Sequence, residues 1–544
     1  MRHLLAVFCC YFAVFSVSVQ ANEQTISDSQ ISTAVAPSTS MLIQQLVEVK
    51  LSKSLPLLER LEAEGGTELL PLFKTLLEGR LYFIKSTKQV VAADKTGSDY
   101  QLFDLFSGET LGMMNKKQIK KIRVNNKLRV FLRGAIARLD LKHPDADKRL
   151  AAVKALLTSL DSSTLNTLEA IRNTESDEHV LAMIDLALAL DLSRSPIPEK
   201  RLAAVTVLGD SLESDSRNRL NVMAESDPDT QVKQAAEVAL KKINERIEFY
   251  DFVDQLFFGL SLGSVLLLAA IGLAITFGVM GVINMAHGEM IMLGAYTTYV
   301  VQLMMPEYIE YSLWVAIPAA FVVSGLFGIL IERGVIRHLH GRPLETLLAT
   351  FGISLILQQL VRTVFSPLNR QVESPLWMSG SLEINPVLSL TFNRLYILAF
   401  ALLVFGLLLL ILRKTSLGLN VRAVSQNRSM AKAMGIRTDW VDAMTFGLGS
   451  GIAGIAGVAL SQLTNVGPNL GQSYIIDSFM VVVFGGVGNL WGTLVAAFSL
   501  GVANKFLEPV TGAVLASILV LVFIILFIQK KPKGLFPQKG RAAE

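Results

Sequence analysis

The chain has 544 residues, of which 51% are hydrophobic, with a formal net charge of +4 and a mean hydropathy of +0.46. This composition is too apolar for an ordinary soluble protein and favours a membrane protein. Charged residues crowd residues 22–250, whereas residues 251–544 contain long stretches without any charge. We therefore expect a soluble half followed by a membrane-embedded half.

The first residues have the features of a secretory signal peptide. The basic start MRH is followed by an apolar run and by the small-x-small sequence VQA, which ends at Ala21. The run is short for a membrane helix, the alternative interpretation, and the chain then turns polar. We predict that residues 1–21 are removed. Because Cys9 and Cys10 are the only cysteines, the mature chain would form no disulfide.

Residues 22–250 are predicted to form a mainly helical exported domain with two HEAT-like repeats over about 148–245. The sequence KRLAAV begins at Lys148 and again at Lys200, and each copy is followed by the triplet ESD before a second helix. Apolar residues recur at helical spacing, which predicts two helices in each unit of about fifty residues. The Asp and Ser residues before the second helices are expected to cap them.

A short segment of this half, residues 80–115, has a different pattern. Its β-rich runs are separated by a Thr-Gly and a Ser-Gly pair, which predicts a small hairpin or sheet. The basic residues that follow are interpreted as a solvated face rather than an anion-binding patch. His143 and His179 are isolated, so no metal-ligand spacing is present in this half.

The membrane half, residues 251–544, contains apolar stretches of the length that a helix needs to cross a bilayer. A further stretch, 475–504, is broken by glycines and predicts a re-entrant hairpin or two short helices. The expected fold is an all-α polytopic domain of about eight spans with broken segments. Spans are predicted at roughly 256–279, 289–305, 312–332, 346–365, 395–412, 443–463 and 509–528.

The charge of the loops predicts the orientation. Segments 333–345 and 413–440 and the C-terminal tail are rich in Lys and Arg, whereas 306–311 and 464–474 contain neither. Basic segments stay on the cytoplasmic side of a membrane. We therefore expect a protein of the bacterial inner membrane whose N-terminal domain lies in the periplasm.

The stretch GVINMAHGEM, residues 281–290, interrupts two apolar runs with polar groups between glycines. An ionisable residue inside a membrane segment is a functional hypothesis by default, and irregular backbone there lines a cavity or is buried in protein. Packing of His287 and pairing of Glu289 near the interface are the alternatives. The residues predicted to line a solute pathway are Asn284, His287 and Glu289, with Gly486 and Asn489 at the second glycine break.

Two further patterns concern the helices near the cytoplasmic loop. Asp442 and Asp477 lie near the expected helix ends and are predicted to cap them. Small residues recur at every fourth position of one predicted span, which is typical of close helix packing in lipid rather than of a flexible gate. These residues are Gly449, Ala453, Gly457 and Ser461.

The loop 413–440 contains a short predicted helix that ends at Gly435. Its Ala431-x-x-x-Gly435 pattern resembles the coupling loop of permease subunits of ABC importers, although Ser429 and Met430 stand where many permeases have Glu-Ala. The resemblance implies that this helix sits in a cleft of an ATPase subunit. The residues it assigns to the contact are Arg422, Ser429, Ala431, Gly435 and Ile436.

The run from Leu260 to Gln302 resembles the start of the branched-chain amino acid permease family. The resemblance continues through the coupling loop, the FGGVG sequence that starts at Phe484 and the KGLF sequence that starts at Lys533. The sequences NMAHGE and GAYTTY, together with the long N-terminal extension, resemble the urea branch most. The resemblance implies a permease that imports urea by alternating access; the alternative is a permease for branched-chain or other small amino acids.

The expected partners follow from the same resemblance. The chain has no GxxxxGK[ST] phosphate loop, so ATP and Mg²⁺ are expected on separate subunits, and this chain is expected to bind no cofactor and to be no enzyme. A distant alternative is an intramembrane hydrolase using Ser450 and His287, although LGSG lacks the leading Gly of that motif. The implied partners are a second permease subunit, two ATP-binding subunits, a periplasmic solute-binding protein, a small-molecule solute and membrane lipid, without nucleic acid.

Overall fold

The structure, a computed structural model, describes residues 37–49, 54–96, 99–157, 160–339 and 341–536. The predicted signal peptide lies outside these residues. The chain divides into two compact units, Met1–Leu208 and Gly209–Glu544. The boundary expected at residue 250 falls inside helix α11 (Thr230–Met280), which continues without a break from a charged segment into an apolar one.

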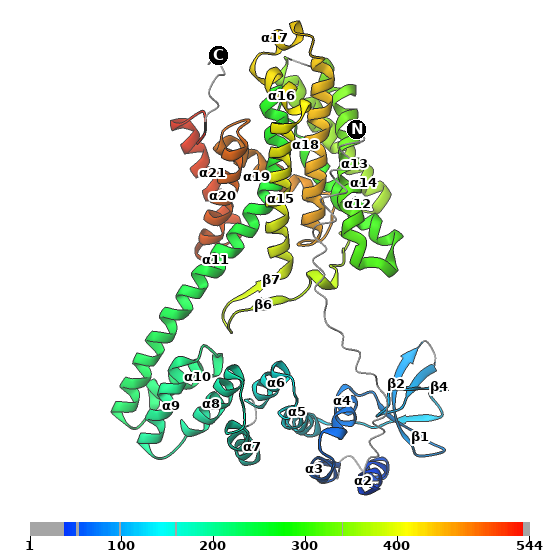
Figure 1. The fold of residues 1–544 in the computed structure, drawn as a ribbon, viewed down its shortest axis with the longest axis vertical. Coiled ribbons are helices and arrows are strands. Elements are labelled where there is room, and N and C mark those ends of the chain that lie inside the picture. Colours follow the sequence, from blue (N-terminus) through cyan, green and yellow to red (C-terminus); the bar gives the residue numbers. More distant parts are fainter. Residues whose placement is uncertain (1–36, 50–53, 97–98, 158–159, 340, 537–544) are drawn as a thin grey trace. The chain divides into compact units, whose positions relative to one another are not determined.

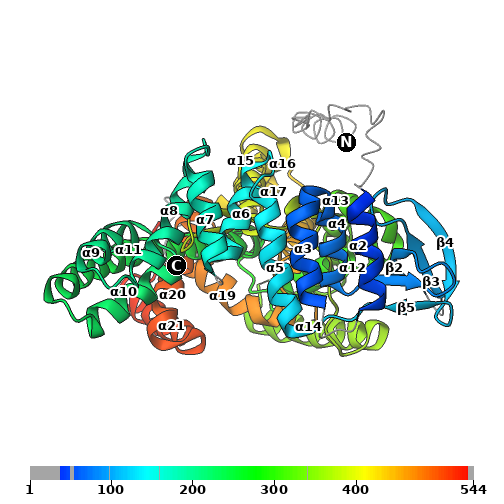
Figure 2. The same ribbon diagram turned by 90° about the horizontal axis from the view of Figure 1, so that it is seen from below.

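The described part of the N-terminal unit begins with helices α2, α3 and α4 and a five-stranded antiparallel sheet, which lies next to α2 (Figures 1 and 2). The sheet confirms the prediction for residues 80–115 and has the strand order β4-β3-β2-β1-β5. Leu58, Phe73 and Leu81 are fully buried where the helices meet the sheet. The elements are α2 (Pro37–Glu48), α3 (Ser54–Gly65), α4 (Leu70–Glu78), β1 (Leu81–Ile84), β2 (Val90–Thr96), β3 (Asp99–Phe103), β4 (Thr110–Asn115) and β5 (Ile119–Lys121).

Helices fill the rest of this part of the chain, and their spacing shows the internal repeat. Helices α6, α7 and α8 begin at residues 146, 162 and 178, and α9, α10 and α11 begin at 198, 214 and 230, an interval of 52 residues in each case. The unit therefore holds three helices, whereas two were predicted, because the middle helices share little sequence. Their bounds are α5 (Asn126–Asp140), α6 (Ala146–Leu156), α7 (Ser162–Arg172), α8 (Glu178–Leu192), α9 (Pro198–Asp210) and α10 (Ser214–Ser226).

Matching side chains occupy matching positions in the two copies. Arg149 Nη1 donates to the carbonyls of His143 and Pro144, and Arg201 Nη1 donates to those of Ser195 and Pro196. The caps expected at the second helices are also present. The side chain of Asp177 accepts from two backbone N–H groups of α8, and that of Asp229 accepts from two of α11.

The second unit is a helical bundle in which α18 is surrounded by α11, α12 and α13 (Figure 1). Among the described residues, seven helices are long and apolar enough to cross a membrane: α11, α13, α14, α15, α18, α20 and α21. Helices α12 and α19 are not among them. The remaining bounds are α12 (His287–Met304), α13 (Ile309–Gly334), α14 (Pro343–Phe365), α15 (Phe392–Lys414), α16 (Ser416–Gln426), α17 (Arg428–Ala433), α18 (Thr438–Ser461), α19 (Leu470–Gly485), α20 (Leu490–Thr511) and α21 (Ala513–Lys530).

Small residues allow α18 to approach its neighbours closely. A Cβ atom added at Gly449 would lie 2.7 Å from the carbonyl oxygen of Gly272 in α11, and one added at Gly457 would lie 2.0 Å from that of Ile291 in α12. Ala453 is fully buried between these positions. The small-residue pattern therefore lies where α18 contacts two other helices.

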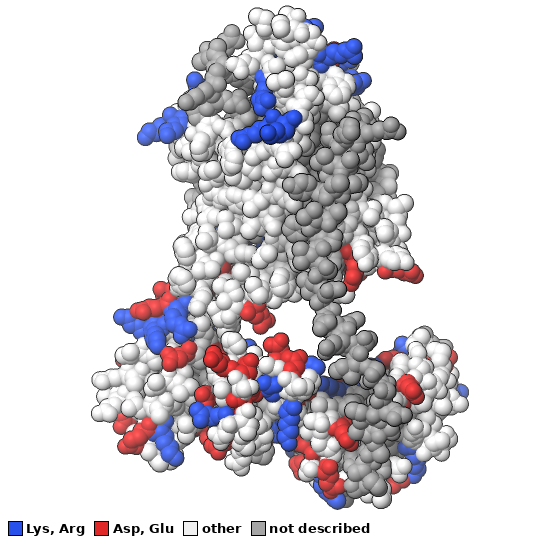
Figure 3. All heavy atoms as spheres, in the orientation of Figure 1, with Lys and Arg blue, Asp and Glu red and all other residues white. Residues whose placement is uncertain are grey.

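The charges of the bundle are separated along its length. Figure 3 shows basic side chains at the end that carries α16 and α17, and acidic side chains at the opposite end. The segments that follow α13 and α15 supply basic residues, among them Arg337 and Arg422, to the end with α16 and α17. At the opposite end, Glu307 lies just before α13 and Glu310 lies in its first turn. The basic and acidic loops thus gather at opposite ends of the bundle, and the orientation in the membrane stays a prediction.

Candidate functional site

The GVINMAHGEM stretch folds back into the bundle after α11. Helix α11 ends at Met280, and Gly281 follows in the left-handed conformation with φ 68°. The chain then returns along α11, so that Nε2 of His287, the first residue of α12, donates to the carbonyl of Ala269 at 2.9 Å. Ala269 lies eleven residues before the end of α11, which corresponds to roughly 16 Å of helix. Because a bilayer core is about 30 Å thick, α12 begins near its middle.

A second helix begins at the same depth. The chain between α18 and α19 is held by a reciprocal pair of backbone hydrogen bonds between Arg370 and Val466, of 2.7 and 2.8 Å. Gly471, in the first turn of α19, then lies so close to Gly288 that a Cβ atom at Gly288 would be 2.5 Å from its carbonyl oxygen. Neither α12 nor α19 has a side-chain N-cap. Two helix N-termini, each with a partial positive charge, therefore meet inside the bundle.

Four polar side chains meet beside these N-termini, and we call Glu289, Ser354, Gln358 and Gln472 the polar cluster. One carboxylate oxygen of Glu289 accepts from Ser354 Oγ at 2.9 Å and from Gln358 Nε2 at 2.8 Å. Gln472 Nε2 donates to Ser354 Oγ at 3.4 Å. The cluster therefore joins α12, α14 and α19.

The polar cluster retains unused hydrogen-bonding capacity. Glu289 is only 1% exposed, and its second carboxylate oxygen has no partner among the described residues. The side-chain nitrogen of Asn284 is likewise buried without a partner there. An unsatisfied polar group is costly in a membrane interior, where water is excluded. The second carboxylate oxygen of Glu289 can therefore accept a hydrogen bond from a polar solute.

A hollow of about 440 Å³ opens beside the polar cluster between α14 and α19. Gln358 and Gln472 belong to both the hollow and the cluster. Phe351 and Leu355 give it an apolar wall, as is usual for sites that bind small molecules. We call this space the α14 hollow, and its remaining lining residues are Asn469 and Ser473.

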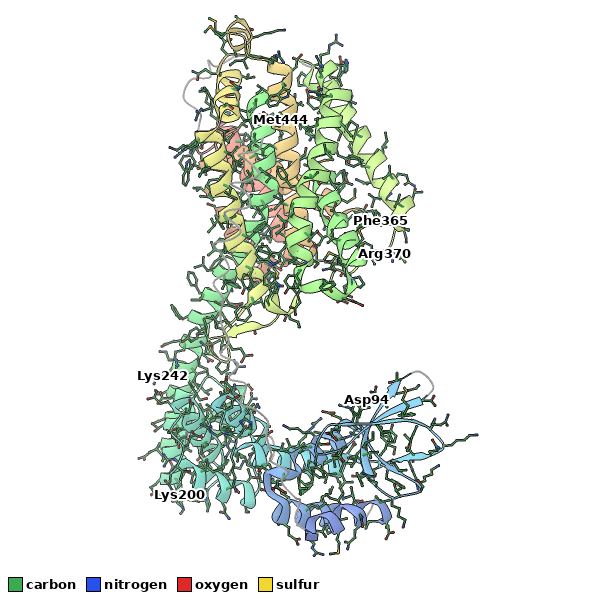
Figure 4. All side chains as sticks on the ribbon, turned by 45° about the vertical axis from the view of Figure 1, so that its right-hand side comes forward. Asp94, Lys200, Lys242, Phe365, Arg370 and Met444 are labelled. Carbon is green, nitrogen blue, oxygen red and sulfur yellow. The ribbon has the colours of Figure 1, made fainter. Side chains whose placement is uncertain are left out.

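Aromatic residues cover the side of the polar cluster that faces the acidic end of the bundle. Tyr296 lies two turns after Glu289 on α12, and its ring centroid is 4.8 Å from that of Phe365. Arg370 stacks over Tyr299, with its guanidinium carbon 6.0 Å from the ring centroid. Figure 4 shows Arg370 near Phe365, the last residue of α14, and the guanidinium of Arg370 donates to the carbonyl of Phe365.

The three predicted polar residues of GVINMAHGEM have different surroundings. Glu289 belongs to the polar cluster, but His287 is fully buried against α11. The Oδ1 atom of Asn284 accepts from Ala286 N at 3.0 Å and so holds the turn before α12. A pathway role for His287 and Asn284 stays a prediction, while their contacts are those of residues that fix the start of α12.

The structure does not bring Gly486 and Asn489 to the polar cluster. They form the turn between α19 and α20, where Asn489 Oδ1 caps α20 by accepting from Gly492 N at 3.2 Å. The C-terminal segment packs on this turn: Asn489 Nδ2 donates to the carbonyl of Phe536, and Leu535 N donates to that of Phe484. The irregular segment that leads to the polar cluster lies instead at residues 462–469, before α19.

The short helix predicted in the loop 413–440 is present as α17; its coupling role stays a prediction. Asn427 caps its start, and Gly435, with φ 88°, ends it through a hydrogen bond from Ile436 N to the carbonyl of Ala431. Ala431 is buried, whereas Met430 and Met434 are 61% and 78% exposed. Arg422 and Ser429 are exposed and Ile436 is partly buried. The helix thus presents two large apolar side chains to its surroundings, as expected for a docking surface.

The predicted caps at Asp442 and Asp477 are wrong. Both residues lie in the second turn or beyond, because α18 begins at Thr438 and α19 begins at Leu470. Asp442 instead forms an ion pair with Arg428 of α17. The predicted helices began too late in the sequence, because helix boundaries are the least reliable part of a sequence-based prediction.

The hydrolase alternative has no support in the geometry. Ser450 Oγ has no hydrogen-bond partner among the described residues, so it does not bond to His287. It faces α13, where a Cβ atom at Gly328 would lie 2.3 Å from it. His287 faces α11 instead, and a nucleophile needs a base within hydrogen-bond reach.

Comparison with known proteins gives matches to permease proteins, among them permeases for branched-chain amino acids and for ribose. The family described as branched-chain amino acid transport system / permease component matches residues 255–528. The high-affinity branched-chain amino acid transport system permease protein BraD of Pseudomonas aeruginosa is 30% identical over 297 residues, 53% of this chain and 96% of that protein. The corresponding protein LivH of Salmonella typhimurium is 31% identical over 300 residues, again 53% and 96%. No solved structure matches the chain.

Proposed function

This chain belongs to the family of branched-chain amino acid transport system permease components, and from that membership we propose that it is the membrane-spanning subunit of an ATP-driven importer. The matched residues, 255–528, include every helix from α12 to α20. Members of this family are transport subunits rather than enzymes, and ATP is hydrolysed on separate subunits. The chain itself binds the solute and changes between states open to either side of the membrane.

The first candidate solute is a branched-chain or other small amino acid. BraD and LivH are named as permeases for branched-chain amino acids. The polar cluster is the observation that carries the proposal, because Glu289 can bind an ammonium group while the N-termini of α12 and α19 favour a carboxylate. The apolar wall of the α14 hollow, with Phe351 and Leu355, suits an aliphatic side chain.

Urea is the second candidate, and a separate observation favours it. Both side chains that donate to Glu289 are neutral, and the cluster consists otherwise of amides and a hydroxyl group. Such groups suit a small neutral solute that offers N–H donors and one carbonyl acceptor. The names of the relatives support the amino acid more strongly, so urea takes second place.

Movement would reach the polar cluster from α17 through α18. The coupling helix is tied to α18 by the ion pair between Arg428 and Asp442. Helix α18 contacts α12 at Gly457 and Ile291, two residues after Glu289. When the ATPase subunits close, a displacement of α17 would therefore shift α18 against α12 and change access to the cluster.

The proposed assembly follows from the family. It consists of this chain, a second permease subunit, two ATP-binding subunits and a periplasmic solute-binding protein, in the inner membrane of a bacterium. In this arrangement the basic end of the bundle faces the cytoplasm, and the N-terminal part of the chain, residues 22–250, whose repeats we propose to be HEAT-like, lies in the periplasm. That part would then offer a surface to the solute-binding protein.

Uptake measurements test the proposal. In a strain that lacks this chain, we expect uptake of radiolabelled leucine to fall to background and to return with the wild-type chain. Glu289→Gln, which keeps the shape of the side chain, should restore less than about a tenth of that uptake. Lost urea uptake with leucine uptake intact would select the second candidate, and intact uptake of both would refute the proposed function.

A further inference from the structure

A second hollow lies outside the polar cluster, and we call it the α20 hollow. It has a volume of about 410 Å³, is open on one side and is bordered by α11, α19, α20 and α21. The residues of α20 and α21 that line it, such as Glu508 and Ala513, lie next to the turn that joins these helices. This is the end of α20 far from Asn489 and therefore far from the C-terminal segment. The volume is within the range of sites that bind small molecules.

The α20 hollow contains a carboxylate that the bundle leaves without a partner. Asp477 lines it from the middle of α19, a helix that is otherwise largely apolar after Tyr474. No hydrogen bond or ion pair joins Asp477 to another of the residues that the structure describes. A charged group in a membrane segment is rare and costly unless it serves a partner or a solute. Asp477 is thus available to a cationic group.

The opposite wall carries a cation and further polar groups. Lys505 Nζ is 2.5 Å from Glu508 Oε2, which uses one of the three donors of the ammonium group. Asn504 Nδ2 donates to Ser517 Oγ at 3.3 Å and leaves its own oxygen available. With Asp477 and Glu508 against Lys505, the hollow has one more negative than positive charge. It therefore offers sites of both signs and a surplus for a positive group.

From this arrangement we propose that the α20 hollow is a second binding site, for the zwitterion of a small amino acid. Asp477 binds the ammonium group, and Lys505 binds the carboxylate in place of part of its contact with Glu508. Leu262, Leu266 and Val520 surround the aliphatic side chain. The inference rests on the proposed function, since it takes the amino acid as the transported solute.

The position of α19 connects the two sites. Ser473 lines both the α20 hollow and the α14 hollow, and its neighbour Gln472 belongs to the polar cluster. A solute leaving Asp477 would therefore travel around a single helix to reach Glu289. The α20 hollow would hold the solute before it enters the polar cluster.

Equilibrium binding to the complete transporter tests the second site. The complex is purified into lipid nanodiscs and titrated with radiolabelled leucine in the absence of ATP. Asp477→Asn and Lys505→Met are each expected to weaken leucine binding at one of the two sites by about tenfold and to leave the other site unchanged, whereas Asp477→Glu, which keeps the charge, should bind within about threefold of the wild type at both sites. Glu310→Gln, which removes an exposed carboxylate from the start of α13, is the matched control and should bind normally.

The outcomes separate the two proposals. Normal leucine binding and uptake by Asp477→Asn and Lys505→Met would overturn the second site and leave the proposed function intact. Absence of leucine binding and uptake in the wild type would overturn the amino acid as solute, and the second site with it. If Asp477→Asn does not assemble, the comparison of Lys505→Met with the Glu310→Gln control decides.

Discussion

Arg428 and Asp442 form a two-pronged ion pair that joins α17, the proposed coupling helix, to α18. Arg428 is the first residue of α17, and Asp442 lies in α18. One guanidinium nitrogen donates to Oδ1 of Asp442 at 3.2 Å and another donates to Oδ2. The aspartate side chain is 3% exposed, so the pair is largely shielded from water on that side. Bidentate pairs of this kind fix direction as well as distance.

The first prediction concerns this ion pair. Arg428→Ala should lower uptake by at least about tenfold, because α17 would lose its fixed connection to α18 and Asp442 would be left buried without its partner. ATP hydrolysis by the assembled complex should continue, since the ATPase subunits are unchanged. Parallel measurements of uptake and ATPase activity in proteoliposomes separate the two effects. Recovery of uptake in the exchanged pair, Arg428→Asp with Asp442→Arg, supports a direct link, and normal uptake in the single variant refutes it.

The second prediction concerns the end of α17. Gly435 has φ 88°, and no atom lies within 4 Å of the position where a Cβ atom would be. A substitution there therefore acts through backbone strain alone, about 1–2 kcal/mol for most residues. Gly435→Val should reorient the residues after α17 and abolish uptake while the protein still inserts into the membrane. Gly435→Asn is the matched control, because Asn tolerates the left-handed conformation, and it should retain most uptake; equal loss in both would refute the backbone explanation.

Part of the candidate site was predictable from the sequence, and GVINMAHGEM shows how much. The polar residues and glycines of this stretch indicated a helix break and drew attention to Glu289. The same residues did not predict how deep in the bundle the break lies. That depth depends on the contact between His287 and Ala269, which are 18 residues apart in the sequence. The return of the chain along α11 is a tertiary feature that local pattern does not encode.

Ser354 and Gln358 were not predicted as partners of Glu289, although their spacing indicated a shared polar face. Ser354 and Gln358 lie four residues apart in an apolar span, so they share one face of α14. Two polar groups on one face of a membrane helix indicate a polar contact. No neighbouring polar residue on the same helix face indicated a role for Gln472. The glycine run at Gly486 was predicted to line the pathway instead, because glycine indicates an irregular backbone whether it lies inside the membrane or at its surface.

The third prediction concerns the close packing of α18. An alanine at Gly457 would place its Cβ 2.0 Å from the carbonyl oxygen of Ile291, which is backbone and cannot yield. Gly457→Ala should therefore force α12 away from α18 and lower the amount of folded protein in the membrane by several-fold. Gly406→Ala in α15 is the control, because no atom lies within 4 Å of its added Cβ. Fluorescence-detected size-exclusion chromatography measures both variants, and equal accumulation would contradict the packing argument.

The fourth prediction concerns pH and the N-terminal unit. The guanidinium of Arg149 holds both carboxylate oxygens of Glu175, at 2.7 and 2.8 Å, and lowers the pKa of Glu175 from 4.5 to about 2. Because the pKa is lower in the folded state, the stabilisation from ionised Glu175 is complete above pH 4.5 and is lost as the pH falls towards about 2. Amide hydrogen exchange in α6 and α8 of the complete chain should therefore accelerate over this interval.

The variant Arg149→Ala isolates the cause of this acceleration. It should make the step between pH 4.5 and about 2 much smaller, because the hydrogen bond from Arg149 is the largest cause of the lowered pKa of Glu175, while the backbone N–H groups of Ser176 and Asp177 still bind the carboxylate. Arg172→Ala is the matched control: it removes a more exposed ion pair, with Asp185, and should leave the step in place. If Arg149→Ala exchanges with the same pH dependence as the wild type, groups other than Glu175 control the acid stability of these helices.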